Sequence, residues 1–197
     1  MKINRFDQAK ILSPQELHLL FNHEDGLRMP RDKALFAICL YTGARIGEAC
    51  QLSTLDVYKA DGSVRPRITL RKNTTKGKQD TRSVPVSAEL RPYLEAYSSP
   101  KAYLFPGRWG RGHLKSDSAD QILREALERL QIEGVSTHSF RRTCLTTMHR
   151  AHTPLKVTQK ISGHRTLAAL QRYLEVLDED LDSAIATLNF QAQGNDN

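Results

Sequence analysis

The apolar residues of the chain recur mainly at the spacing of amphipathic helices. Segment 30–41 is apolar nearly all round, which is typical of a helix buried on most sides. Segments 13–23 and 118–130 carry apolar residues three and four positions apart, which predicts helices with one buried face. Similar patterns predict further helices over 46–52, 87–97, 137 onward, 154–162, 166–177 and 180–188. The chain is therefore expected to be mainly α-helical.

Capping residues mark several of these helix ends. Ser13 begins a capping box, and Ser118 can cap a later helix in the same way. Thr153-Pro154 suits the cap and first position of a helix that Gly163 ends. These signals place helix boundaries on both sides of the chemically interesting residues near the C-terminus.

The apolar period changes from 3.6 to 2 between residues 54 and 86. This change, with turn signals at Asp61-Gly62 and Lys76-Gly77, predicts short strands joined by tight turns. The predicted strands are 54–58, 67–71 and 81–86. The expected fold class is mainly α with a small three-stranded antiparallel β-sheet (α+β).

Length and composition agree with one folded unit. The chain has 197 residues, of which 39% are hydrophobic, and we expect a single domain over 1–190 with a disordered tail over 191–197. No apolar run reaches the ~18 residues needed to cross a membrane. Cys39, Cys50 and Cys144 lie in apolar helical patterns, so a disulfide framework is not expected. These features favour a cytoplasmic protein with reduced thiols.

The net charge of +7 is unevenly distributed along the chain. Arg172 is the last basic residue, and six of the 22 acidic residues follow it. The body of the chain is therefore more basic than the net charge suggests. A basic body favours a polyanionic partner, and nucleic acid is the leading candidate.

Four residues near the C-terminus form a pattern suited to binding an anion. In a helix, His138 and Arg141 are three positions apart and would present two donors on one face. His164 follows Gly163 at the end of the next predicted helix, and Tyr173 lies at the margin of a later apolar stripe. Read singly, such residues could instead cap helices or seal a helix edge.

An earlier box, Thr42-Gly43-Ala44-Arg45-Ile46-Gly47-Glu48, completes the pattern. Read alone, its arginine could be a surface residue paired with Glu48 at i,i+3. Together and in this order, the boxes resemble the tyrosine recombinase, or phage integrase, family over residues 12–188, and the resemblance implies that family's catalytic-domain fold. In that family two arginines and two histidines bind the scissile phosphate and a tyrosine attacks phosphorus. The matching residues here are Arg45, His138, Arg141, His164 and the nucleophile Tyr173.

The resemblance also implies a lysine that assists the leaving oxygen from a hairpin. Lys76 fits best, because it lies in the predicted turn shortly before an Arg-x-Val-Pro strand, while Lys78 and Lys72 remain alternatives. Such lysines could also protect a sheet edge or contact phosphate without taking part in chemistry.

Further basic residues are candidates for contacts with DNA. The glycine-rich segment 107–115 has the composition of a basic loop suited to phosphate contact, and a loop of solvated charges is the alternative interpretation. The candidates are Lys72, Lys78, Arg108, Arg111, Lys115 and Arg142.

The resemblance predicts a site-specific DNA recombinase that works through a covalent 3′-phosphotyrosine intermediate. Arginines suit the charge that builds on the phosphate oxygens in the transition state. No cofactor is expected, and no metal, since His149 and His152 have no evident third ligand. The alternatives are a DNA-binding regulator or excision accessory protein on the same scaffold, and an enzyme like the type IB topoisomerases.

One departure from the family pattern concerns the start of the chain. Most members carry an N-terminal core-binding domain, and here the catalytic pattern begins within about ten residues of Met1. The sequence is therefore interpreted either as a compact recombinase or as part of a longer one. The expected partner is double-stranded DNA, bound by a homotetramer on paired sites, in the cytoplasm with the nucleoid.

Overall fold

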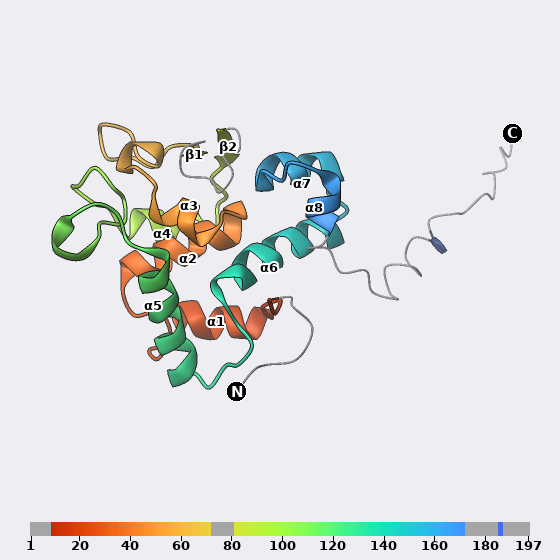
Figure 1. Cartoon of the computed structure of the whole chain (residues 1–197), viewed down its shortest axis with the longest axis horizontal. Coiled ribbons are helices and arrows are strands. Elements are labelled where there is room, and N and C mark those ends of the chain that lie inside the picture. Colours follow the sequence, from red (N-terminus) through yellow and green to blue (C-terminus); the bar gives the residue numbers. More distant parts are fainter. Residues whose placement is uncertain (1–8, 72–80, 172–184, 187–197) are drawn as a thin grey trace, which may run out of the picture.

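The computed structural model describes residues 9–71, 81–171 and 185–186. Its described part is mainly helical, as predicted, with a small antiparallel sheet (Figure 1). The α-helices are α1 (Pro14–Asn22), α2 (Pro30–Thr42), α3 (Ile46–Cys50), α4 (Arg91–Glu95), α5 (Ser116–Arg129), α6 (Thr137–Arg150), α7 (Leu155–Ser162) and α8 (Leu167–Gln171). Two short 3-10 helices, η1 (Thr54–Asp56) and η3 (Arg108–Gly110), lie in the connections.

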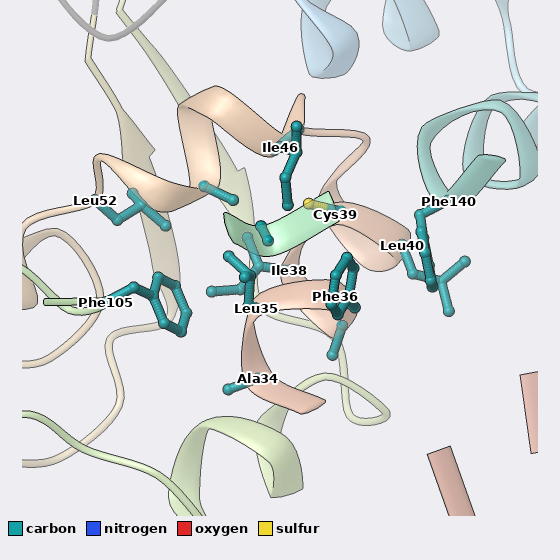
Figure 2. Packing of buried hydrophobic residues seen from close by; sticks show 14 of the residues in the cluster. Ala34, Leu35, Phe36, Ile38, Cys39, Leu40, Ile46, Leu52, Phe105 and Phe140 are labelled. Atoms are coloured by element: carbon teal, nitrogen blue, oxygen red, sulfur yellow. The ribbon is translucent and has the colours of Figure 1, made fainter. Parts of the chain in front are cut away.

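Helix α2 forms the centre of the core. Its side chains from Ala34 to Cys39 are fully buried, which explains why this segment is apolar nearly all round. Phe36 stacks on Phe140 of α6 with ring centroids 5.0 Å apart, and Figure 2 shows the two rings side by side. This contact fixes α6, which carries His138 and Arg141, against the helix that leads into the Arg45 box.

The sheet has two strands among the described residues, β1 (Arg67–Leu70) and β2 (Arg82–Pro85). They pair antiparallel, with Leu70 opposite Arg82. The prediction of a strand over 54–58 is wrong, because this segment begins with η1. A carboxylate oxygen of Asp56 accepts the backbone N–H of Ser53 at 3.0 Å, and this capping box favours a helical turn over an extended strand.

Several predicted helix boundaries shift in the structure. Helix α5 begins two residues before the predicted cap Ser118, and α7 has Pro154 as its cap rather than as its first helical residue. Only Arg91–Glu95 of the predicted 87–97 helix is helical, and Pro92 lies in its first turn, where the missing N–H is tolerated. Most of the predicted 180–188 helix lies outside the described residues.

The hairpin strands and α7 lie on one side of the molecule in Figure 1, and β2 contacts α7. Helix α6 packs on α2 and also contacts α7. The segments that carry the predicted phosphate-binding residues are therefore neighbours in space, although they span more than 100 residues of sequence. Among the described helices, none has the length and apolar composition that a membrane crossing requires.

Candidate active site

Arg141 lies at the centre of the site. Its side chain extends from the second turn of α6 and is only 1% exposed. The guanidinium donates to the backbone carbonyl of Gly43, at the end of α2, and to that of Ser162, at the end of α7, the latter at 3.0 Å. A buried guanidinium requires such acceptors, and here it joins the ends of two helices that are distant in sequence.

His164 is placed beside Arg141 by a turn that ends α7. Gly163 adopts a left-handed conformation (φ 69°), which a residue with a side chain rarely adopts, and it reverses the chain after the helix. The Nε2 atom of His164 then lies 3.0 Å from Nη2 of Arg141, and its Nδ1 atom lies 2.8 Å from Oγ of Ser162. The sequence prediction that His164 lies at a helix end, next to a turn, is confirmed.

The partners and the burial of His164 both bear on the charge of its ring. A guanidinium only donates, so the ring accepts from Nη2 of Arg141, which lies 3.0 Å from Nε2 and 3.4 Å from Nδ1. Burial, followed by the positive charges of Arg141, Arg45 and Arg82, lowers the pKa of His164 to about 3. The imidazole is therefore neutral around pH 7.

Arg45 is the N-cap residue of α3 and is partly exposed. Its Nη1 atom lies 3.1 Å from Oε1 of Glu48, and its backbone N–H donates to Oε2 of the same carboxylate at 2.9 Å. The i,i+3 ion pair considered in the sequence thus exists, but it is not a surface pair, since Glu48 is 1% exposed. Glu48 holds both the backbone and the guanidinium of Arg45.

Sequence reasoning missed a second arginine at this carboxylate. Arg82, the first residue of β2, contacts Glu48 through Nη2 and Oε2 at 2.6 Å and through Nη1 and Oε1 at 3.3 Å. Burial alone would raise the pKa of Glu48, but the hydrogen bonds and charges of Arg82 and Arg45 lower it, so the carboxylate stays ionised. The available signal was the alternation of β2, which turns Arg82 and Val84 inward.

The remaining predicted site residues are located less completely. His138 lies in the first turn of α6, one turn before Arg141, with an exposed side chain. The proposed nucleophile Tyr173 and the lysines Lys72, Lys76 and Lys78 lie outside the described residues. The structure therefore brings together Arg45, Arg141 and His164, with His138 at the start of the same helix as Arg141.

The predicted DNA contacts in segment 107–115 are exposed. Arg108, Arg111 and Lys115 all have exposed side chains, and the guanidinium of Arg108 lies 5.5 Å from the ring centroid of Trp109. In Figure 1 the green loop lies at the opposite side of the view from α7 and α8, and its last residue, Lys115, leads into α5, which contacts α3.

Arg142 does not fit the prediction of a DNA contact. Its side chain is 8% exposed, and its Nη1 atom donates to the carbonyl of Ala9 at 2.6 Å. The position after Arg141 turns this arginine into the protein, where it fixes the start of the described chain against α6. Its role is structural.

The described residues contain no group of three His, Cys, Asp or Glu side chains that could hold a metal ion. Cys39, Cys50 and Cys144 are buried free thiols, as the sequence indicates. Burial raises the pKa of Cys50 and Cys144 to about 12, so both are protonated and unreactive near neutral pH.

Known proteins of one family share this sequence pattern and fold. The chain is 31% identical over 172 residues to a tyrosine recombinase of Thermosipho africanus, covering 85% of this chain and 56% of the relative. It is 30% identical over 169 residues to tyrosine recombinase XerD of Chlorobaculum tepidum, covering 80% of this chain and 52% of the relative. This chain thus spans little more than half the length of these relatives.

Solved structures show the same fold. The crystal structure of XerA recombinase superposes with a TM-score of 0.73 at 24% identity, over 90% of this chain and 64% of that one. The XerH recombinase in a post-cleavage complex with its DNA substrate superposes with a TM-score of 0.70 at 22% identity, over 93% of this chain and 55% of that one. A sequence profile of the phage integrase family matches residues 10–180. Because this match covers most of the chain, the chain belongs to the phage integrase family.

Proposed function

We propose that this chain is the catalytic part of a site-specific recombinase, which cleaves and rejoins DNA through a covalent 3′-phosphotyrosine intermediate. The observation that carries the proposal is the convergence of Arg45, Arg141 and His164 at the ends of three helices. Two guanidinium groups beside a neutral imidazole form a receptor for one phosphodiester. The relatives named as tyrosine recombinases support the same activity.

The proposed chemistry follows from the charge of the substrate. A phosphodiester gains negative charge on its non-bridging oxygens as a nucleophile attacks, and fixed cations stabilise that charge without reorganisation. Arg45 and Arg141 would bind these oxygens, because a guanidinium stays charged and donates several hydrogen bonds. His138 would donate a further hydrogen bond to the phosphate, and the neutral ring of His164 could donate only through its single N–H.

The nucleophile and the general acid are proposed from the family pattern. Tyr173 would attack phosphorus, and nearby guanidinium groups would favour its ionisation from an ordinary pKa of ~10. Lys76 would protonate the leaving 5′ oxygen, with Lys78 and Lys72 as alternatives. The bond energy is conserved in the phosphotyrosine link, so rejoining by the reverse reaction requires no high-energy cofactor.

The proposed partner is double-stranded DNA, acted on by a homotetramer on two paired sites in the cytoplasm. The XerH structure is of a complex with its DNA substrate, which supports DNA as the substrate class. Because the chain covers little more than half of its relatives, the oligomer and the DNA site are properties to be measured rather than transferred.

Covalent capture tests the proposed function. The protein and a Tyr173→Phe variant are incubated with nicked fragments of the host's DNA, denatured in detergent, and the attached DNA is sequenced. We expect adducts that require Tyr173 and share one sequence. Binding without any adduct would contradict the proposal and favour a DNA-binding regulator. Relaxation of any supercoiled plasmid, with no site preference, would indicate an enzyme like the type IB topoisomerases.

A further inference from the structure

Arg82 is the buried cation of the site that the proposed chemistry does not use. Its side chain is 6% exposed, and both of its terminal nitrogens contact the carboxylate of Glu48, which is itself 1% exposed. Glu48 receives Arg45 on the same carboxylate, through one nitrogen of the guanidinium and through the backbone N–H. Arg82 and Arg45 therefore share one carboxylate. The guanidinium of Arg82 contacts both of its oxygens, whereas the guanidinium of Arg45 contacts one.

Arg82 also contacts the turn that presents His164. A Cβ atom added to Gly163 would lie 2.9 Å from Nη1 of Arg82 and 3.2 Å from its Cδ and Cζ atoms. The guanidinium thus lies flat against the glycine that ends α7, and the charge of Arg82 is one of those that act on the His164 ring. A single side chain of β2 consequently touches the supports of two phosphate-binding residues.

We propose that Arg82 is a positioning residue, which holds the guanidinium of Arg45 and the ring of His164 in place for one phosphate by engaging Glu48 and packing against Gly163. The inference rests on the proposed function, since it assigns Arg82 a role in that site. Arg82 acts through its neighbours and does not itself need to touch DNA.

The physical reason is competition for Glu48. A carboxylate offers two oxygens, and a guanidinium forms its best contact when it binds both. While Arg82 occupies Glu48 in this way, the guanidinium of Arg45 is held at one oxygen. Without Arg82, Arg45 becomes the nearest partner for the whole carboxylate, and a two-pronged contact would draw its guanidinium toward Glu48 and away from the phosphate.

The other strand of the hairpin offers a matched control. Arg71, which follows β1, binds the buried carboxylate of Asp56 through Nε at 2.8 Å and Nη2 at 2.6 Å. This pair has the same chemistry on the same hairpin, but Asp56 caps η1 rather than α3, and the side chain of Arg71 is 58% exposed. Both nitrogens of Arg71 contact Oδ1 of Asp56, so Arg71→Lys removes a two-nitrogen contact with a buried carboxylate without touching Glu48 or Gly163.

The first experiment needs no DNA. The ring nitrogens of His164 are observed by NMR in the wild-type chain and in the folded Arg82→Lys and Arg71→Lys variants. We expect the His164 signals to move in Arg82→Lys, because the contact with Gly163 is lost, and to stay in place in Arg71→Lys. Unchanged His164 signals in a folded Arg82→Lys variant would overturn the proposal.

The second experiment measures covalent cleavage and a rescue. We expect the single-turnover rate of adduct formation to fall on the order of 10- to 100-fold in Arg82→Lys, because misplaced groups lose their alignment with the phosphate. Arg71→Lys should stay within about twofold of wild type. In the double variant Arg82→Met with Glu48→Gln, we expect a rate roughly tenfold higher than in Arg82→Met alone, because a neutral amide no longer captures the guanidinium of Arg45.

A merely structural role would give a different pattern. If Arg82 only supported the fold, the cleavage rates of the single and double variants would follow their free energies of unfolding, and that result would overturn the proposal. If the wild-type chain forms no adduct with DNA, the proposed recombinase function is wrong. The NMR signals of His164 then decide separately whether Arg82 positions this ring.

Discussion

The side chain of His164 lies near the guanidinium groups of Arg141, Arg45 and Arg82. Burial and these positive charges, rather than solvent, determine the charge of its ring. Arg141 donates to Nε2, and the charges of Arg45 and Arg82 add to the effect of burial on its pKa. A neutral imidazole can accept from one neighbour and donate to another, which a protonated ring could not do. The hydrogen-bonding role of His164 thus follows from its surroundings.

This environment makes the stability of the protein depend on His164 at acid pH. The folded-state pKa of about 3 lies below the ordinary value of 6.5, so between these values the unfolded chain binds a proton that the folded chain does not. We expect the free energy of unfolding to fall as pH drops from about 6.5 toward 3, and His164→Asn to remove part of this dependence.

Urea denaturation of both proteins at pH 7 and pH 4.5 measures the effect. His149→Asn, on the neighbouring helix α6, controls for the loss of an imidazole as such. A wild-type chain that gains stability relative to His164→Asn on acidification would contradict the assigned neutral ring.

The three hairpin lysines differ in the chemistry that we propose for them. If Lys76 protonates the leaving 5′ oxygen, Lys76→Ala should slow cleavage of ordinary DNA on the order of 100-fold. DNA with a sulfur atom at the 5′ bridging position should be cleaved at a nearly normal rate, because a thiolate of pKa ~8.5 leaves without a proton.

Lys72→Ala and Lys78→Ala provide the comparison on the same substrates. Each should weaken DNA binding without a difference between oxygen and sulfur leaving groups. Rescue by sulfur in Lys78→Ala instead would reassign the general acid to Lys78.

At the scale of elements, the backbone conformation of the turn after α7 determines where His164 lies in the site. Gly163 has a positive φ of 69°, and Arg82 packs over the place where a side chain would begin. The left-handed conformation alone costs a residue with a Cβ atom about 1–2 kcal/mol. The contact with Arg82 adds a steric cost that the other positive-φ glycines of the described residues lack.

Comparison with Gly62 separates the steric cost at Gly163 from the cost of its positive φ. It also has a positive φ, 82°, but a Cβ atom there meets nothing within 4 Å. We expect Gly62→Ala to lower the free energy of unfolding by about 1–2 kcal/mol, and Gly163→Ala to lower it further. Equal losses in denaturant titrations would show that Arg82 moves aside without cost.

The sequence was sufficient to predict those elements in which local chemistry decides the structure. Gly43 and Gly163 end helices because their conformations suit glycine, and both ends were expected. The segment 54–58 was predicted as a strand from its alternating pattern alone. The capping box of Ser53 and Asp56 was present in the sequence and favours the observed turn.

The residues that we propose to bind phosphate were identified from motifs that resemble the family, and their supports were not identified. Arg45, Arg141 and His164 carry charge or donors at fixed spacings within single elements. Arg82 acts on Glu48 from 34 positions away, so its role depends on how β2 packs against α3 and α7. The alternation of β2 indicates that Arg82 points inward, but its pairing with Glu48 is tertiary, and a single sequence contains no local signal for that partner.

At the scale of the whole molecule, basic residues outside the cluster would add affinity for DNA without chemistry. Arg108 and Arg111 are exposed on the loop that lies at the opposite side of the view from α7 in Figure 1. Each phosphate contact contributes about 0.9 to the slope of the logarithm of affinity against the logarithm of salt concentration.

Substitution of the loop arginines tests whether this loop reaches DNA. If both residues contact phosphate, Arg108→Gln with Arg111→Gln should reduce the salt slope by about two and leave the sequence preference unchanged. Fluorescence anisotropy at several salt concentrations measures the slope. Arg124→Gln removes an exposed arginine already paired with Asp120 on α5 and should not alter it. An unchanged slope in the double variant would place the loop outside the DNA interface.

The contacts of Arg141 have a consequence for the newly made chain. Its guanidinium is bound by the terminal carbonyls of α2 and α7 while its own backbone belongs to α6. No one of these helices can assemble the charged pocket by itself, and a partly folded chain lacks it. If the chain cleaves DNA as we propose, a partly folded copy lacks the assembled site and is not expected to break the genome.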